Sequence, residues 1–340
     1  MSAFLAGVTA ITDEKQEMTS VSTLHPSISG LAKAGGTKLG LGIDAGGTQT
    51  RWALANDAGQ IIADGFVNGF TALQAGTLAG RLGLSEVLQE LANAVSKYGT
   101  PAKVRAGLTG YGGQAETADE LRKLLAQPWN LLPQDIVLSN DIELAYQDNF
   151  FPGEGYLVYS GTGSIAAYID IEGNFHRAGG HGGVLDDAGG GFWIAREALR
   201  HIWRQEDETP GSWRKSAMAQ KVFEYVGGTD WSSSREFIYS GTRGQVGMLA
   251  LAVAAAADTD KVAYGILKDA GRELARLAIA LCGRYGIRPV VLAGRVQELH
   301  PVIAQTMHAA LPADYSLRQS SSQPHFAAAR IASDFGKQKT

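Results

Sequence analysis

The sequence predicts an α/β protein built from two similar halves. Three observations support this fold class. Predicted strands alternate with predicted helices from residue 38 onward. A unit of strand, glycine-rich turn, strand, short turn and strand occurs twice, at residues 38–65 and 155–180. The length of 340 residues suits about two domains. The chain has 43 glycines among these 340 residues, a larger share than the usual ~7 %.

Charge, hydropathy and cysteine content exclude several classes of protein. The net charge of −4 gives no sign of a nucleic-acid partner. No apolar run approaches the ~20 residues that span a bilayer, and no basic region precedes the apolar patch at the N-terminus. Cys282 is the single cysteine, which excludes an internal disulfide framework and a cysteine-rich zinc site. We expect a cytoplasmic protein that binds neither membrane nor nucleic acid.

The first domain is expected to span residues 38–147. The preceding residues 1–37 are rich in Ser, Thr, Gly and Ala, and their weak periodicity predicts a flexible N-terminal extension. After the first unit, the pattern predicts a helix within residues 71–98, a strand over 104–108, a helix over 117–125, a strand over 136–139 and a helix from residue 142.

The second domain is expected to span residues 148–335. Its leading unit matches the first in design, because Gly46 precedes the next turn glycine, Gly59, by 13 residues, and Gly161 precedes Gly173 by 12. We interpret the match as an internal duplication with a cleft between the halves; the alternative is two unrelated hairpins. The remaining pattern predicts a helix over 192–204, further helices to about 285, a strand over 289–292, and helices over 301–311 and 325–333.

The two glycine-rich turns are candidate phosphate sites. Backbone N–H groups in such turns form a nest for anions, and glycine lets the phosphate approach closely. Asp44 lies at the end of the strand before the first turn. It is a candidate Mg²⁺ ligand, acting directly or through water. Neither turn is a P-loop or a Rossmann fingerprint, because no Gly-Lys-Ser/Thr follows and each leads into a strand. The candidate ligands of the phosphates and of Mg²⁺ are Asp44, Gly46, Gly47, Thr48 and Thr50 in the first turn, and Gly161, Thr162, Gly163 and Ser164 in the second.

Asp141 follows a predicted strand and opens a predicted helix. A carboxylate in that place could take a proton from a substrate hydroxyl as a general base. It could equally be the N-cap of the helix, which is the commoner use of Asp there. By contrast, the phosphate-turn look-alike at residues 240–244 has no flanking strands, so it predicts only a loop that begins a helix.

Five segments follow one another along the chain: LGIDAGGTQTRWAL, SNDIELA, VYSGTGSIAAYI, GGHGGVLDDAGGGFWIAREAL and VVLAGRV. In this order they resemble the sugar kinase, Hsp70 and actin ATPase superfamily, and within it the N-acetylglucosamine kinase or glucosamine kinase-like members of the BadF/BadG/BcrA/BcrD ATPase family. The resemblance implies two duplicated ribonuclease H-like domains, as in actin-like ATPases, with a cleft between them.

The resemblance also implies the roles of particular residues. ATP and Mg²⁺ would be the cofactors, with both turns on the phosphates, Asp44 toward the metal and Asp141 as the general base. Gly294 and Arg295 would border the adenosine. The sugar would contact Asn68, Tyr111, Gly112, Asp141, Gly180 and Asp187.

Departures from the family pattern bear on the sugar more than on phosphoryl transfer. Ala188 replaces a glutamate, and the alignment could slip between Asp186 and Asp187. Ala293 replaces the first glycine of the adenosine turn, and Tyr111 stands where a serine is usual.

The expected function is an ATP-dependent kinase that phosphorylates the 6-hydroxyl of N-acetylglucosamine or glucosamine, acting as a possible homodimer. One alternative is an activator ATPase of the 2-hydroxyacyl-CoA dehydratase or reductase type, which a single cysteine per chain disfavours because an iron–sulfur cluster usually takes four thiolates. The other is a non-catalytic sugar sensor, which the lack of a helix-turn-helix pattern in residues 1–37 disfavours.

Overall fold

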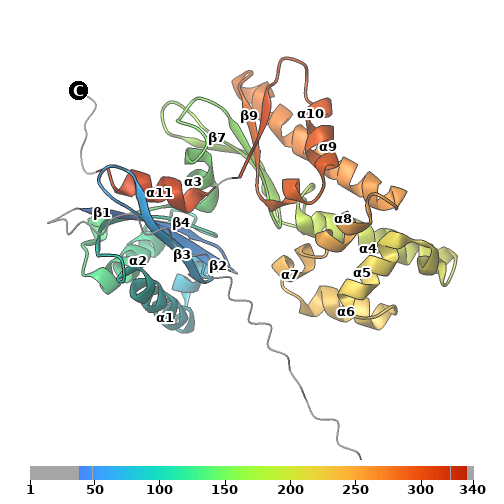
Figure 1. The fold of residues 1–340 in the computed structure, drawn as a ribbon, viewed down its shortest axis with the longest axis horizontal. Helices are drawn as coiled ribbons and strands as arrows, with labels where there is room; N and C mark the ends of the chain where they lie inside the picture. Colours follow the sequence, from blue (N-terminus) through green and yellow to red (C-terminus); the bar gives the residue numbers. More distant parts are fainter. Residues whose placement is uncertain (1–37, 48, 322, 335–340) are drawn as a thin grey trace, which may run out of the picture. The chain divides into compact units, whose positions relative to one another are not determined.

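The computed structural model describes residues 38–47, 49–321 and 323–334, and these contain two five-stranded sheets (Figure 1). The first sheet has the order β3-β2-β1-β4-β5 and the second the order β10-β9-β6-β7-β8. Their strands are β1 (Leu39–Ala45), β2 (Gln49–Ala55), β3 (Ile61–Asn68), β4 (Pro101–Leu108), β5 (Ile136–Asn140), β6 (Tyr156–Ser160), β7 (Ser164–Ile169), β8 (Phe175–Gly179), β9 (Val290–Ala293) and β10 (Leu317–Ser320).

The two sheets share one topology. In the first, β1, β2 and β3 are antiparallel, and β4 and β5 continue in parallel from β1. In the second, β6, β7 and β8 repeat the antiparallel part, and β9 and β10 continue in parallel from β6. The predicted duplicated α/β fold is therefore confirmed, and the alternative of two unrelated hairpins is wrong.

Strand β1 shows how the sequence assigns the two faces of the first sheet. Its odd-numbered residues, such as Leu41 and Ile43, are fully buried in a core formed with α1 (Leu78–Val95) and α2 (Ala115–Ala126). Successive side chains of a strand point to opposite faces, so Gly40 and Gly42 face the other way. Figure 1 shows α1 and α2 on one side of this sheet and α11 on the other.

The last helix, α11 (Pro324–Ala332), packs on β1, β2 and β4 of the first sheet. It lies so close that a Cβ on Gly42 would stand 2.8 Å from Ala328 Cβ and overlap the helix backbone. Helix α3 (Asp141–Gln147) approaches β4 in the same way at Gly107 and also contacts β6 and β7. The division of the chain near residue 147 stays a prediction, but α11 belongs with the first sheet by its packing.

We predict that Gly42→Ala destabilises the protein by about 1–3 kcal/mol, because the new methyl group forces α11 away from the sheet. Thermal or urea unfolding measures the effect. The matched control is Gly265→Ala within α9 (Lys261–Tyr285), where an added Cβ meets nothing within 4 Å. We expect the control to be neutral or stabilising. Equal stability of the Gly42 variant and the wild type would contradict this packing.

The remaining helices largely follow the predicted pattern and surround the second sheet's core. The predicted helix within residues 71–98 is divided into a short 3₁₀ helix and α1, and β10 was not predicted. The other elements are α4 (Gly191–Glu208), α5 (Ala217–Val226), α6 (Trp231–Ser240), α7 (Arg243–Gly247), α8 (Ala250–Ala256), α10 (Pro301–Ala310), and the 3₁₀ helices η1 (Ala72–Gly76), η2 (Gln127–Trp129), η3 (Pro133–Asp135), η4 (Ser212–Lys215) and η5 (Arg295–Glu298).

Two predictions made from the sequence concern parts of the chain outside the described residues. The flexible extension of residues 1–37 is one, and the phosphate contact of Thr48 is the other. Within the described part of the chain, no helix combines the length and the apolar character that crossing a membrane requires.

Candidate functional site

The first glycine-rich turn follows β1 and is closed by its own backbone, since Gly46 N donates a hydrogen bond of 3.1 Å to Gln49 O. Asp44 ends the face of β1 that α11 covers, and its cross-strand partner is Arg51. Thr50 is fully buried, and its Oγ1 has no hydrogen-bond partner among the described residues. Buried hydroxyls are normally bonded, so bound water or a ligand would satisfy this one.

Asp141 is the first residue of α3, and the helix is capped by its neighbour instead. Asn140 Oδ1 accepts a hydrogen bond of 2.6 Å from Glu143 N, and Glu143 Oε2 accepts one of 3.1 Å from Asn140 N. This reciprocal pair is a capping box, and its N-cap residue is Asn140. The interpretation of Asp141 as the N-cap is therefore wrong, because Asn140 occupies that position.

Thr109 connects the Asp141 carboxylate to the first turn. Its hydroxyl donates a hydrogen bond of 2.7 Å to Asp141 Oδ2, and its backbone N–H donates one of 3.0 Å to Ala45 O. The other carboxylate oxygen, Oδ1, accepts from Ile142 N at 3.0 Å. Each carboxylate oxygen has two lone pairs, so Asp141 keeps acceptor capacity for a substrate hydroxyl. Sequence reasoning missed Thr109, although it noted the turn in which Thr109 lies.

Nearby charges and burial shift the pKa values of Asp44 and Tyr159 at the site. Burial and the nearby Asp141 carboxylate raise the pKa of Asp44 from 3.8 to about 6, although the charge of Arg51 opposes the shift. Burial and the charges of Asp44 and Asp141 raise the pKa of the Tyr159 hydroxyl to about 12. The charge of Asp141 thus acts on both Asp44 and Tyr159.

Tyr159 is the counterpart of Asp44 in the duplicated unit. Each lies two residues before the first glycine of its turn, Gly46 or Gly161. The duplication therefore places an acid in one half and a tyrosine in the other, and the charge of Asp44 contributes to the raised pKa of Tyr159. Tyr159 was not among the candidate site residues predicted from the sequence.

The second turn is fastened to the glycine-rich block that follows β8. Ser160 Oγ donates to Gly189 O, and Ser164 Oγ donates to Ala188 O, both at 2.7 Å. A serine hydroxyl has one proton, so Ser164 cannot also donate it to a phosphate while this bond lasts. Its predicted hydroxyl contact with phosphate would require that bond to break, whereas its backbone N–H does not depend on it.

Helix α4 begins directly against the second turn. Gly191 N donates to Gly161 O at 2.8 Å, and Phe192 N donates to Thr162 O at 3.0 Å. A Cβ on Gly190 would stand 2.7 Å from Gly163 Cα, so the chain reaches this distance only with glycine. The N–H groups at the start of α4 thus hold the second turn by bonding to the carbonyl groups of Gly161 and Thr162.

The turn after β9 meets the second turn from the other side. Gly294 has φ +94°, and a Cβ on it would stand 3.0 Å from Ser160 N and overlap the Ser160 carbonyl. This backbone conformation and this close approach both require glycine. Arg295 follows, and its charge acts on the pKa of Tyr159, so Arg295 lies near the site. The structure thus brings the predicted adenosine turn against the predicted phosphate turn.

The predicted sugar ligands divide between the two turns. Asn68 is the cross-strand partner of Gln49 beside the first turn, and its Nδ2 donates to Glu90 Oε2 at 3.1 Å. Gly180 N donates to Ser164 O at 3.0 Å beside the second turn.

Three further predicted sugar ligands lie in loops. Tyr111 and Gly112 lie in the turn after β4, where Tyr111 N donates to Leu108 O at 3.1 Å. Asp187 is buried and forms an ion pair with Arg243, a residue that sequence reasoning placed only in a helix-start loop. That loop was predicted correctly, since Thr242 is the N-cap of α7.

A sequence profile and two curated proteins match the chain. The profile of the BadF/BadG/BcrA/BcrD ATPase family matches residues 41–315. An N-acetylmuramic acid/N-acetylglucosamine kinase of Clostridium acetobutylicum is 27 % identical over 240 residues, which are 69 % of this chain and 76 % of that protein. An N-acetyl-D-glucosamine kinase of Dictyostelium discoideum is 26 % identical over 200 residues, which are 54 % of this chain and 59 % of that protein.

Solved structures share the fold at low sequence identity. A candidate N-acetylglucosamine kinase from Chromobacterium violaceum has a TM-score of 0.66 at 22 % identity, covering 87 % of this chain and 99 % of that one. One from Porphyromonas gingivalis has a TM-score of 0.68 at 16 % identity, covering 88 % and 99 %. A ROK family glucokinase from Streptomyces griseus, solved with glucose and AMPPNP, has a TM-score of 0.52 at 17 % identity, covering 88 % and 99 %.

Proposed function

Because the chain belongs to the BadF/BadG/BcrA/BcrD ATPase family, we propose that it is an ATP-dependent kinase that phosphorylates the 6-hydroxyl of an amino sugar. N-acetylglucosamine and glucosamine are the acceptors we favour, since the curated relatives carry the names of N-acetyl sugar kinases. The single observation that carries the proposal is the position of Asp141, which is not the N-cap of α3 and is linked to the end of β1 through Thr109.

In this proposal Asp141 is the general base. A sugar hydroxyl donates a hydrogen bond to the carboxylate, and its proton passes to Asp141 as the hydroxyl oxygen attacks the γ-phosphorus of ATP. The bond from that phosphorus to the bridging oxygen breaks, and ADP leaves. Thr109 holds Asp141 Oδ2, so the carboxylate keeps one orientation while the sugar binds.

The nucleotide would lie along the two turns. Backbone N–H groups of the first turn and of Gly161–Ser164 would bind the phosphates, and Gly294 and Arg295 would border the adenosine. The charge of Arg51 beside Asp44 adds positive potential at the first turn. The predicted cleft between the halves would be the place where these groups meet.

The residues present also fit a magnesium ion. Burial and the charge of Asp141 raise the pKa of Asp44, and a divalent cation at Asp44 would favour its ionised form. Asp44 would hold the ion, directly or through water, and phosphate oxygens and water would supply the other ligands. When bound, Mg²⁺ neutralises charge on the phosphates.

The sugar would replace existing hydrogen bonds of the chain. Asn68 would exchange Glu90 for a sugar hydroxyl, and Asp187 would accept another, with Tyr111, Gly112 and Gly180 lining the pocket. Closure of the halves on the sugar would exclude water, which otherwise competes as the acceptor.

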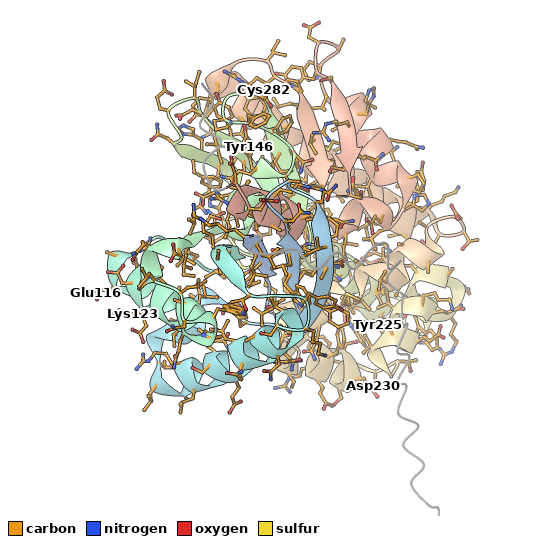
Figure 2. The ribbon with its side chains drawn as sticks, turned by 60° about the vertical axis from the view of Figure 1, so that its left-hand side comes forward. Glu116, Lys123, Tyr146, Tyr225, Asp230 and Cys282 are labelled. Atoms are coloured by element: carbon orange, nitrogen blue, oxygen red, sulfur yellow. The ribbon has the colours of Figure 1, made fainter. Side chains whose placement is uncertain are left out.

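The activator ATPase is a weaker alternative because the single cysteine of this chain, Cys282, is buried. Cys282 lies on α9 and is 4 % exposed (Figure 2). Burial raises the pKa of this thiol, which disfavours the thiolate that a cluster needs. The cytoplasmic location and the homodimer stay predictions.

A coupled assay of ADP release over about a dozen sugars tests the proposed function. We expect N-acetylglucosamine or glucosamine to give turnover well above the rate without sugar, and phosphorus NMR of the product to show a 6-phosphate. Release of ADP only with a non-sugar alcohol would show that the acceptor is wrong. MgATP binding with no turnover on any sugar would favour the sensor.

A further inference from the structure

Arg243 forms an ion pair across two segments that the sequence does not connect. Its Nη2 contacts Asp187 Oδ2, although the two residues are 56 positions apart. Asp187 belongs to the glycine-rich block, whereas Arg243 is the first residue of α7. The Asp187 side chain is 5 % exposed and that of Arg243 is 43 % exposed, so the carboxylate is the buried partner.

Asp187 is held in a conformation that costs free energy. Its φ is +59°, in the left-handed region that L side chains rarely adopt. Its Oδ1 accepts a hydrogen bond of 3.0 Å from Gly182 N, so backbone and guanidinium together fix the carboxylate. Strain of this kind persists where the surrounding structure imposes it, and such places are often functional.

The ion pair lies directly against the second turn. A Cβ on Gly163 would overlap Asp187 Oδ2 and stand 2.8 Å from Arg243 Nη2. The guanidinium carbon also lies 5.8 Å from the centre of the Phe192 ring, in the first turn of α4. Both charges are therefore next to the backbone groups that would bind phosphate.

An unpaired carboxylate in that position would oppose nucleotide binding. The interaction between a buried carboxylate and a phosphate is repulsive and is poorly screened by solvent. A guanidinium bonded to the carboxylate cancels most of this repulsion, and it also compensates for the burial of the acid.

We propose that Arg243 is a positioning residue that neutralises Asp187 against the second turn, so that one acid can serve the sugar without repelling the nucleotide. The inference rests on the proposed function, in which the second turn binds the phosphates of ATP. Arg243 lies outside the five segments that resemble the family. In the proposal it affects the affinity for nucleotide, and it does so through Asp187.

Titration of the protein with MgADP, without sugar, tests the inference by calorimetry. We expect Arg243→Gln to raise the Kd for MgADP about tenfold or more. In the Asp187→Asn background the same substitution should change Kd less than twofold, because no carboxylate remains to be neutralised. In steady-state assays the single variant should raise the KM for ATP more than it lowers kcat.

Further variants separate the proposed effect from misfolding. Arg243→Lys keeps the charge and should recover part of the affinity. Arg272→Gln removes a surface arginine that pairs with Asp269 on α9, and we expect it to bind MgADP as the wild type does. Thermal unfolding checks that each variant is folded at the temperature of the titration; the double variant has no buried charge to destabilise it.

Each result supports or overturns the inference. An unchanged Kd for Arg243→Gln overturns it, and so does an equal loss in the Asp187→Asn background, which would make Arg243 a direct phosphate ligand. Failure of the wild type to bind MgADP would overturn the proposed function as well. Normal MgADP binding by the wild type with no sugar turnover would overturn the kinase alone, since the titration needs no sugar.

Discussion

Replacing Asp141 by Asn is expected to lower kcat at least ~100-fold while leaving the affinity for MgATP close to that of the wild type. The amide cannot accept the proton of the sugar hydroxyl, but it preserves the size of the side chain. The fold should tolerate the change, because Asn140 and Glu143 form the capping box of α3 and the amide oxygen of Asn can still accept from Ile142 N. Steady-state kinetics and nucleotide titration on one preparation measure both quantities.

The control for this variant is Asp119→Asn on α2, where the carboxylate is exposed and pairs with Arg122. We expect the control to keep wild-type kcat. Turnover of the Asp141 variant within a few-fold of the wild type would remove Asp141 from the chemistry, since the structure already assigns the capping role to Asn140.

Replacing Asp44 by Asn is expected to reduce kcat/KM by about 100-fold and, at neutral pH, to stabilise the protein. The activity falls because the proposed magnesium ligand is lost. The stability rises because the folded protein holds an ionised Asp44 in a buried place near Asp141, which raises its pKa to about 6. We expect a gain on the order of 2 kcal/mol in the free energy of unfolding at pH 7.

The pH dependence of this gain follows from the direction of the shift. Near pH 4 the folded protein holds the Asp44 proton and the unfolded chain begins to release it, so stability falls as pH rises from about 4 to about 6. The Asn variant lacks this fall, so the two proteins should be equally stable near pH 4 and diverge by pH 7. Urea unfolding at several pH values, without magnesium, measures this; Asp64→Asn on the exposed side of β3 is the control. A variant less stable than the wild type at pH 7 would contradict the account.

The sequence predicted the fold well where periodicity and turns are strong. The repeated unit of strands and glycine turns predicted both halves, because tight turns restrict residue choice. Strand β10 was missed because Leu317–Ser320 is short and polar, and only its pairing with β9 makes it a strand. The packing of α11 on the first sheet was missed because no local pattern records which sheet a helix covers.

The candidate site could be predicted only in part for a similar reason. Motif positions such as Asp44 and Asp141 follow from local sequence, and the charge of Asp141 acts on the pKa of Asp44. The capping role of Asn140 was overlooked, although Glu143 three residues later completes a capping-box spacing. Arg243 had no local signal at all, because its partner Asp187 comes from another segment of the fold.

A crystal structure with MgAMPPNP and N-acetylglucosamine tests the central claim most directly. The account predicts phosphate oxygens within hydrogen-bond distance of backbone N–H groups in both glycine turns, and the sugar 6-hydroxyl within hydrogen-bond distance of Asp141. A triphosphate bound away from either turn, or a sugar with no hydroxyl near Asp141, would contradict it.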